Sequence, residues 1–213
     1  METLTTNYNH QSYLKLGLRL EIITIGWMLI EAGVSLYAGF IARSLLLAAF
    51  GIDSVIELIS ASALLYRLHS EAAGNVSSDD AIERLERRAS VIAGGLLFAL
   101  SAYVVCAAIY GLAQHHGASK SGIGIAIALI AAIGMPRLAK AKLKAADKIG
   151  SRALRADAME SLTCGFMAWA LLAGLLANAI FGWWWLDCVF SLAIIPLLLK
   201  EGFEAIRGEC MCH

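Results

Sequence analysis

Acidic side chains lie within the long apolar stretches of this sequence, at spacings that suit the binding of a cation. An ionised group inside a membrane costs about 2.5–3.5 kcal/mol on insertion scales, so a chain that keeps several of them there has a use for them. Asp53 and Glu57 are four residues apart, and Glu160 and Cys164 are also four apart. Residues at this spacing share one face of a helix, so the members of each pair point to the same side.

Two helices that each offer such a pair can surround one divalent cation with four ligands. The predicted metal ligands are therefore Asp53, Glu57, Glu160 and Cys164. Tetrahedral sites built from carboxylates and a thiolate suit zinc. Carboxylates alone favour harder ions, whereas a thiolate favours softer ones. We expect zinc first, with cobalt, cadmium, manganese or iron as alternatives, and no cofactor beyond this ion.

Other roles for these side chains stay open at this point. The acids are alternatively ion-paired, protonated, or exposed to a water-filled cavity, although no Lys or Arg lies inside any predicted span beyond Arg19 at the start of the first. Cys164 is alternatively a small apolar core residue. Asp157 is a secondary candidate, as a fifth ligand, a support for a ligand or a charge at the start of a helix. Glu31 is another, as a ligand, a dimer-seam residue or a group that orients a ligand. Asp187 is expected to cap the last helix.

The elements that position these residues are predicted to be membrane helices. The 213-residue chain is 59% hydrophobic and only 16% charged, against about 45–50% and 25% in soluble domains. Spans of roughly 20 apolar residues cross a hydrocarbon core of about 30 Å. We expect an all-α membrane protein in which residues 1–213 form a single transmembrane domain, without a soluble C-terminal domain. Its six transmembrane helices are predicted at about 18–40, 44–66, 90–113, 122–136, 156–181 and 186–199.

Basic residues predict how the chain is oriented. Of its 17 Lys and Arg residues, all but Arg43 and Lys120 fall on one side of the six predicted spans, together with both termini. The positive-inside rule places that side in the cytoplasm. Trp183, Trp184 and Trp185 mark the opposite interface. No cleavable signal peptide is expected. The fourth span has an apolar stretch shorter than about 20 residues before Pro136, and it reaches across if its helix continues through that residue.

Two segments resemble a known family of membrane proteins. Residues 44–57 are similar to the second helix of the cation diffusion facilitator family, and residues 154–164 are similar to its fifth helix. The family usually has Asp where this chain has Glu57, and His and Asp where it has Glu160 and Cys164. The resemblance implies a six-helix bundle, a homodimer, alternating access, and export of a divalent metal against inward proton flow. We expect an integral protein of a bacterial inner membrane, with both termini cytoplasmic.

The expected function is thus transport of divalent metal ions in exchange for protons, since protons compete with a metal for carboxylates. The expected partners are the metal ion, protons, the lipid bilayer and a second copy of the chain, with no nucleic acid. A membrane protein that binds or senses metal without moving it is the alternative. The sequence has no HExxH or GxSxG motif, so an enzyme is not expected. The tail Cys210-Met211-Cys212-His213 is either a soft-metal site or a frayed end.

Overall fold

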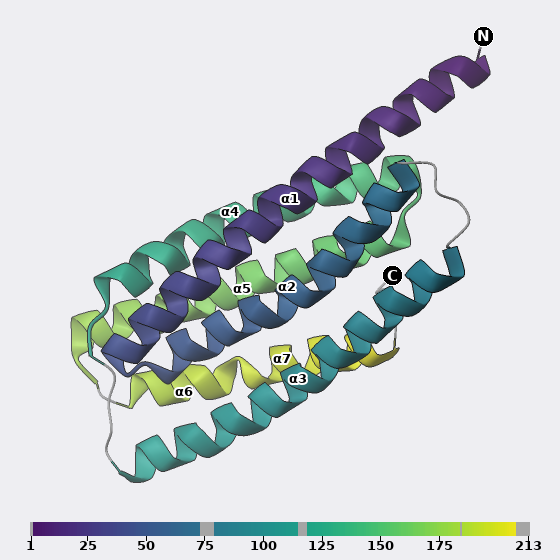
Figure 1. The fold of residues 1–213 in the computed structure, drawn as a ribbon. Helices are drawn as coiled ribbons and strands as arrows, with labels where there is room; N and C mark the ends of the chain where they lie inside the picture. Colours follow the sequence, from purple (N-terminus) through teal and green to yellow (C-terminus); the bar gives the residue numbers. More distant parts are fainter. Residues whose placement is uncertain (1, 73–78, 115–118, 184, 208–213) are drawn as a thin grey trace.

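The computed structural model describes residues 2–72, 79–114, 119–183 and 185–207, and helices account for nearly all of these residues. Five helices are long and apolar enough to cross a membrane (Figure 1). These five confirm the all-α membrane architecture, and no strand occurs among the described residues. They are α1 (Glu2–Ala42), α2 (Leu45–Ala72), α3 (Asp79–Ala113), α4 (Gly122–Ile149) and α5 (Arg152–Phe181).

The segment predicted as the sixth span forms two shorter helices, α6 (Leu186–Ala193) and α7 (Ile195–Arg207), which run end to end beside α3 (Figure 1). The interruption falls just before Pro196, which has no backbone N–H to donate to the preceding turn. At 1.5 Å per residue the two helices together cover about 33 Å, enough for a hydrocarbon core. Helix α7 continues beyond the predicted span end at residue 199, to Arg207.

The fourth span continues through Pro136, as its short apolar stretch required. Ser121 caps the start of α4 by accepting a hydrogen bond from the backbone of Gly124. Gly150 ends the helix at φ 70°, a left-handed conformation that glycine adopts without strain. Ser151 then caps α5. Helix α4 runs 13 residues beyond the predicted span of 122–136, to Ile149.

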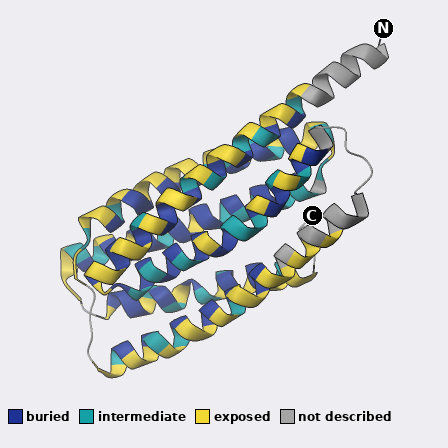
Figure 2. Ribbon diagram, viewed as in Figure 1, coloured by how far each residue is buried: buried dark blue, intermediate teal, exposed yellow. Residues whose placement is uncertain are grey.

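The helices form two groups. The most extensive contacts join α1 to α2 and α4 to α5, and α1 also packs on α4. The second group is the pair of α3 with α6 and α7, which meets the first group along α2 and α5. Buried residues face the interior of this arrangement, while exposed residues cover its outside (Figure 2). Many of the exposed side chains are large and apolar, such as Phe40 and Ile180, as expected for a surface that faces lipid.

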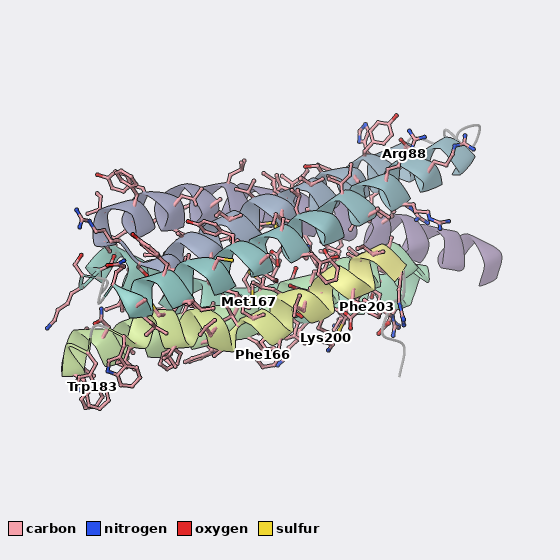
Figure 3. All side chains as sticks on the ribbon, turned by 90° about the horizontal axis from the view of Figure 1, so that it is seen from below. Arg88, Phe166, Met167, Trp183, Lys200 and Phe203 are labelled. Carbon is pink, nitrogen blue, oxygen red and sulfur yellow. The ribbon has the colours of Figure 1, made fainter. Side chains whose placement is uncertain are left out.

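The two ends of the bundle differ in character. Trp183 lies at one end and Arg88 at the other (Figure 3). The rings of Phe181, Trp183 and Trp185 stack at this first end, with centroids 5.0 and 5.5 Å apart. The start of α1 and the end of α7 both lie towards the opposite end (Figure 1). The tryptophan-rich and arginine-rich ends thus match the two interfaces that the sequence predicts.

At the tryptophan end, Asp187 joins α6 to α2. Its carboxylate accepts a 2.5 Å hydrogen bond from the Ser44 hydroxyl and bonds of 2.7 and 3.3 Å from the backbone N–H groups of Leu45 and Leu46. Asp187 therefore caps the start of α2, where the helix dipole favours a negative charge. The expectation that it caps the last helix was wrong, since its side chain reaches across to a neighbour.

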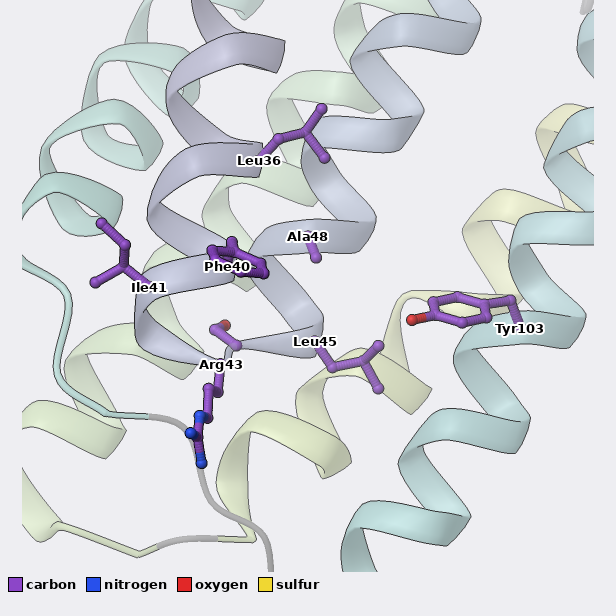
Figure 4. A pocket seen from close by; sticks show the side chains of 9 residues that line it. Leu36, Phe40, Ile41, Arg43, Leu45, Ala48 and Tyr103 are labelled. Atoms are coloured by element: carbon purple, nitrogen blue, oxygen red, sulfur yellow. The ribbon is translucent and has the colours of Figure 1, made fainter.

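Beside this cap, an open pocket lies between the end of α1, the start of α2 and α3 (Figure 4). Leu36, Phe40 and Leu45 form apolar walls, Arg43 lies at the rim and Tyr103 faces them from α3. None of the residues that line this pocket is acidic, so it is separate from the predicted metal ligands.

Candidate metal site

Three buried carboxylates meet between the two groups of helices. Asp53 and Glu57 come from α2, and Glu201 comes from α7. Each offers one oxygen, and these three oxygens lie within 4.8 Å of one another. The side chains are almost fully enclosed, with exposed fractions of 0%, 6% and 8%. The predicted spacing of Asp53 and Glu57 thus places both acids in one cluster, to which the last span adds a third.

No hydrogen-bond donor within the described part of the chain serves this carboxylate trio of Asp53, Glu57 and Glu201. All six of their side-chain oxygens are buried and make no hydrogen bond with those residues. An unpaired buried charge is costly, and like charges this close raise that cost further. A cation bound among the three groups removes both penalties, so the trio has the chemistry of a binding site for a divalent ion.

Glu201 was not predicted from the sequence. The expected last span stopped at residue 199, which placed Glu201 in the terminal arm. A signal was present, because Leu198, Glu201 and Gly202 fall on one helical face at the spacing of a core stripe, and all three are buried. Lys200 and Glu204 lie off this buried stripe, and the Lys200 Nζ atom is 3.8 Å from Oε1 of Glu204. An acid within an apolar stripe is therefore the feature that identifies Glu201.

Glu160 lies next to the trio. It is half-buried on α5, and its carboxylate interacts electrostatically with Asp53, Glu57 and Glu201. It does not belong to the group of oxygens that lie within 4.8 Å of one another. Glu160 is therefore within electrostatic reach of the three carboxylates but outside their group of close oxygens.

Cys164 faces a different acid. Its thiol is fully buried and lies 3.6 Å from Oε1 of Glu31, to which it donates a hydrogen bond. The same carboxylate accepts a 2.6 Å bond from Nε1 of Trp27 and a 2.7 Å bond from the hydroxyl of Ser54. Cys164 also packs within the apolar core. Glu31 is thus surrounded by donors from α1, α2 and α5, in contrast to the trio.

Asp157 is engaged in an ion pair. Its carboxylate contacts the ammonium group of Lys142 on α4, which also lies 3.0 Å from Oε2 of Glu21 on α1. Lys142 and Glu21 have no exposed side-chain surface. The expectation that the acids lack a basic partner was wrong for Asp157, because α4 continues beyond the predicted span and brings Lys142 to it. Asp157 therefore joins a buried triad that links three helices.

The predicted soft-metal tail, Cys210-Met211-Cys212-His213, lies outside the described residues. The six acids that the sequence singled out (Glu31, Asp53, Glu57, Asp157, Glu160 and Asp187) and Cys164 all lie within the described residues. Of these, Asp53 and Glu57 are in the trio, Glu160 is beside it, Cys164 contacts Glu31, Asp157 contacts Lys142, and Asp187 caps α2.

Comparison with known proteins bears on this site. The family model described as the cation efflux transmembrane domain matches residues 22–209, a range that contains the trio, Glu160 and Cys164. A protein from Synechocystis sp. named as an uncharacterized transporter is 25% identical over 188 residues. That alignment covers 87% of this chain and 60% of the relative, so the chain spans about three-fifths of that protein's length.

Proposed function

Because this chain belongs to the cation efflux family, we propose that it moves divalent transition-metal ions across the membrane, exporting them from the cytoplasm in exchange for protons. The observation that supports this most directly is the trio of Asp53, Glu57 and Glu201, whose buried oxygens have no donor among the described residues. Zinc, cobalt, cadmium, manganese and iron are the ions proposed, with zinc first.

Asp53, Glu57 and Glu201 are the proposed central ligands, with Glu160 as the fourth. Four carboxylates can supply a complete coordination shell for a first-row divalent metal. Their origin on α2, α5 and α7 means that the ion contacts both groups of helices at once. Cys164 remains a candidate ligand in this proposal, although its thiol lies on Glu31 in the structure.

Exchange for protons follows from the same carboxylates. Each must lose its proton to hold a metal, so a metal that binds displaces protons and a proton that binds displaces the metal. When the ion leaves, protonation removes the repulsion among the three acids. A higher proton concentration on the side where the metal leaves therefore favours release of the metal from the site.

The proposed location is a bacterial inner membrane, with both termini in the cytoplasm. The start of α1 and the end of α7 lie at the same end of the bundle as Arg88, and Trp183 lies at the other (Figures 1 and 3). Cytoplasmic flanks rich in Arg and Lys are the rule for membrane proteins. The proposed homodimer derives from the family resemblance.

Uptake by proteoliposomes under a pH gradient tests the proposal. Purified wild-type protein is expected to move at least one of the five proposed ions, while Asp53→Asn abolishes that flux and lowers metal affinity about 100-fold or more. Residues that merely support a metal ligand are worth about 10–100-fold, so loss of a ligand is expected to exceed that. Asp147→Asn is the matched control, because Asp147 is exposed and pairs with Arg155.

Two outcomes would contradict parts of this proposal. If wild-type protein moves none of the five ions under any gradient direction, transport is wrong. If the wild-type protein binds metal, and Asp53→Asn weakens that binding, but the wild type moves no ion, the protein holds or senses metal instead of transporting it.

A further inference from the structure

Building on the proposed function, we propose that Glu31 sets the metal preference of the site by holding the Cys164 thiol away from the carboxylate trio. The buried acids inside the helices differ in their partners. The oxygens of Asp53, Glu57 and Glu201 have no hydrogen-bond donor among the described residues, whereas Glu31 has three. Glu31 therefore has a positioning role, and the trio is left to bind the ion.

The surroundings of Glu31 are built to hold its carboxylate in place. It has no exposed surface. Its Oε2 accepts the 2.6 Å bond from Nε1 of Trp27, one turn earlier on α1. Its Oε1 accepts from Ser54 on α2 at 2.7 Å and from the Cys164 thiol on α5 at 3.6 Å. Donors from three helices occupy most of the acceptor positions that a carboxylate offers.

The Cys164 thiol contacts Glu31 and is also within electrostatic reach of the trio. It interacts electrostatically with Glu31, Asp53, Glu57 and Glu201, so all four carboxylates are near it. The backbone on which it sits is tightly packed, because a Cβ on the adjacent Gly165 would lie 2.8 Å from the ring of Pro136. A cysteine has one side-chain torsion, so rotation about a single bond decides which acid the sulfur faces.

This choice changes the chemistry of the site. With the thiol on Glu31, the ion meets oxygen ligands only, a set that favours harder ions such as manganese. With the thiol released, sulfur can join the carboxylates, and the set then favours soft ions such as cadmium. Glu31 acts on the metal through Cys164, and it does not itself need to touch the ion.

The test follows the ultraviolet charge-transfer band that cadmium gives with a thiolate. It uses full-length protein in which Cys106, Cys188, Cys210 and Cys212 are replaced by Ser, so that Cys164 is the one remaining thiol. With Glu31 intact, one equivalent of cadmium is expected to bind without this band. Glu31→Leu removes the acceptor at similar volume, and it is expected to produce the band and to raise the preference for cadmium over manganese at least tenfold.

Two controls connect the effect to the proposed contact. Glu31→Gln keeps an acceptor oxygen and is expected to behave as the protein with Glu31. Glu31→Leu combined with Cys164→Ser is expected to bind cadmium without the band. These two results would support a positioning role for Glu31. A general loosening of the fold would affect the Glu31→Gln and Glu31→Leu variants alike, although only the Gln variant keeps an acceptor oxygen for the thiol.

The inference is overturned if cadmium gives the thiolate band while Glu31 is intact, a result that does not depend on any Glu31 variant folding. It is also overturned if Glu31→Leu binds cadmium with unchanged preference and no band. In both cases metal still binds, so the proposed function survives. If neither manganese nor cadmium binds the protein with Glu31 intact, both the inference and the proposed site are wrong.

Discussion

At the scale of single residues, what separates the buried acids of this protein is the partner that each one has. Asp187 accepts backbone and hydroxyl hydrogen bonds, Asp157 contacts Lys142, and Glu31 accepts three donors. The oxygens of Asp53, Glu57 and Glu201 are served by no donor in the described ranges. Buried polar groups are normally satisfied, so the exceptions indicate where a ligand belongs.

Glu201 gives the residue-scale prediction, because it was found only in the structure. Glu201→Gln is expected to lower metal affinity about as strongly as Asp53→Asn, roughly 100-fold, since a charged ligand becomes a neutral one. Glu204→Gln, on the same helix but off its buried stripe, is expected to leave affinity unchanged. Isothermal titration of the purified variants measures both. Equal affinities for the two variants would remove Glu201 from the site.

At the scale of helices, part of this arrangement could be predicted from the sequence. The pairing of Asp53 with Glu57 needs only helical periodicity, which local sequence determines. Lys142 and Glu201 were misplaced because apolar length was used to end their spans, whereas both helices continue beyond it. Whether a residue near a span end is buried depends on which helices pack there, and that information is not local.

The triad of Glu21, Lys142 and Asp157 gives a prediction about three helices together. Lys142→Met is expected to lower the stability of the fold by about 3–5 kcal/mol, because it leaves two carboxylates buried without their counter-ion. Adding Glu21→Gln and Asp157→Asn is expected to recover most of that loss. Thermal unfolding in detergent measures each variant. A stability loss that the triple variant fails to recover would mean that packing of the lysine stem, and not its charge, is what matters.

The contact between α3 and α7 gives a second prediction at this scale. A Cβ on Gly94 would lie 2.6 Å from the backbone oxygen of Gly202, so the two helices approach through glycines. Gly94→Ala is expected to displace α7 and with it Glu201, at a cost of about 1–3 kcal/mol, and to weaken metal binding. Gly95→Ala is the matched control, because a Cβ there meets no atom within 4 Å. If both variants bind metal as the wild type does, the approach at Gly94 does not position Glu201.

At the scale of the whole molecule, the trio draws its carboxylates from both groups of helices. Asp53 and Glu57 belong to the group of α1, α2, α4 and α5, and Glu201 belongs to the pair of α3 with α6 and α7. An ion held by all three carboxylates would therefore link the two groups of helices. Loss of the ion would leave the carboxylates of the two groups to repel each other. Metal occupancy is in this way coupled to the relative position of the two groups.

This coupling predicts a stability change in the intact protein. Metal at 100 times its dissociation constant is expected to stabilise the wild type by about 2.7 kcal/mol, as for any ligand that binds only the folded state. At the same metal concentration, Glu201→Gln is expected to show little of this gain. Thermal unfolding with and without zinc or manganese measures the difference. An equal metal-induced shift in the variant would place the ion elsewhere.

The break in the last span has a consequence for how such a molecule can move. On one side of Ile194, Asp187 anchors α6 to the first turn of α2. On the other side, α7 carries Glu201 to the trio. One end of the α6–α7 segment is therefore attached to α2, and its helix is interrupted at Ile194, the residue before Ile195 and Pro196. A rotation of α7 about Ile194 would change the distance of Glu201 from Asp53 and Glu57, while Asp187 keeps α6 attached to α2.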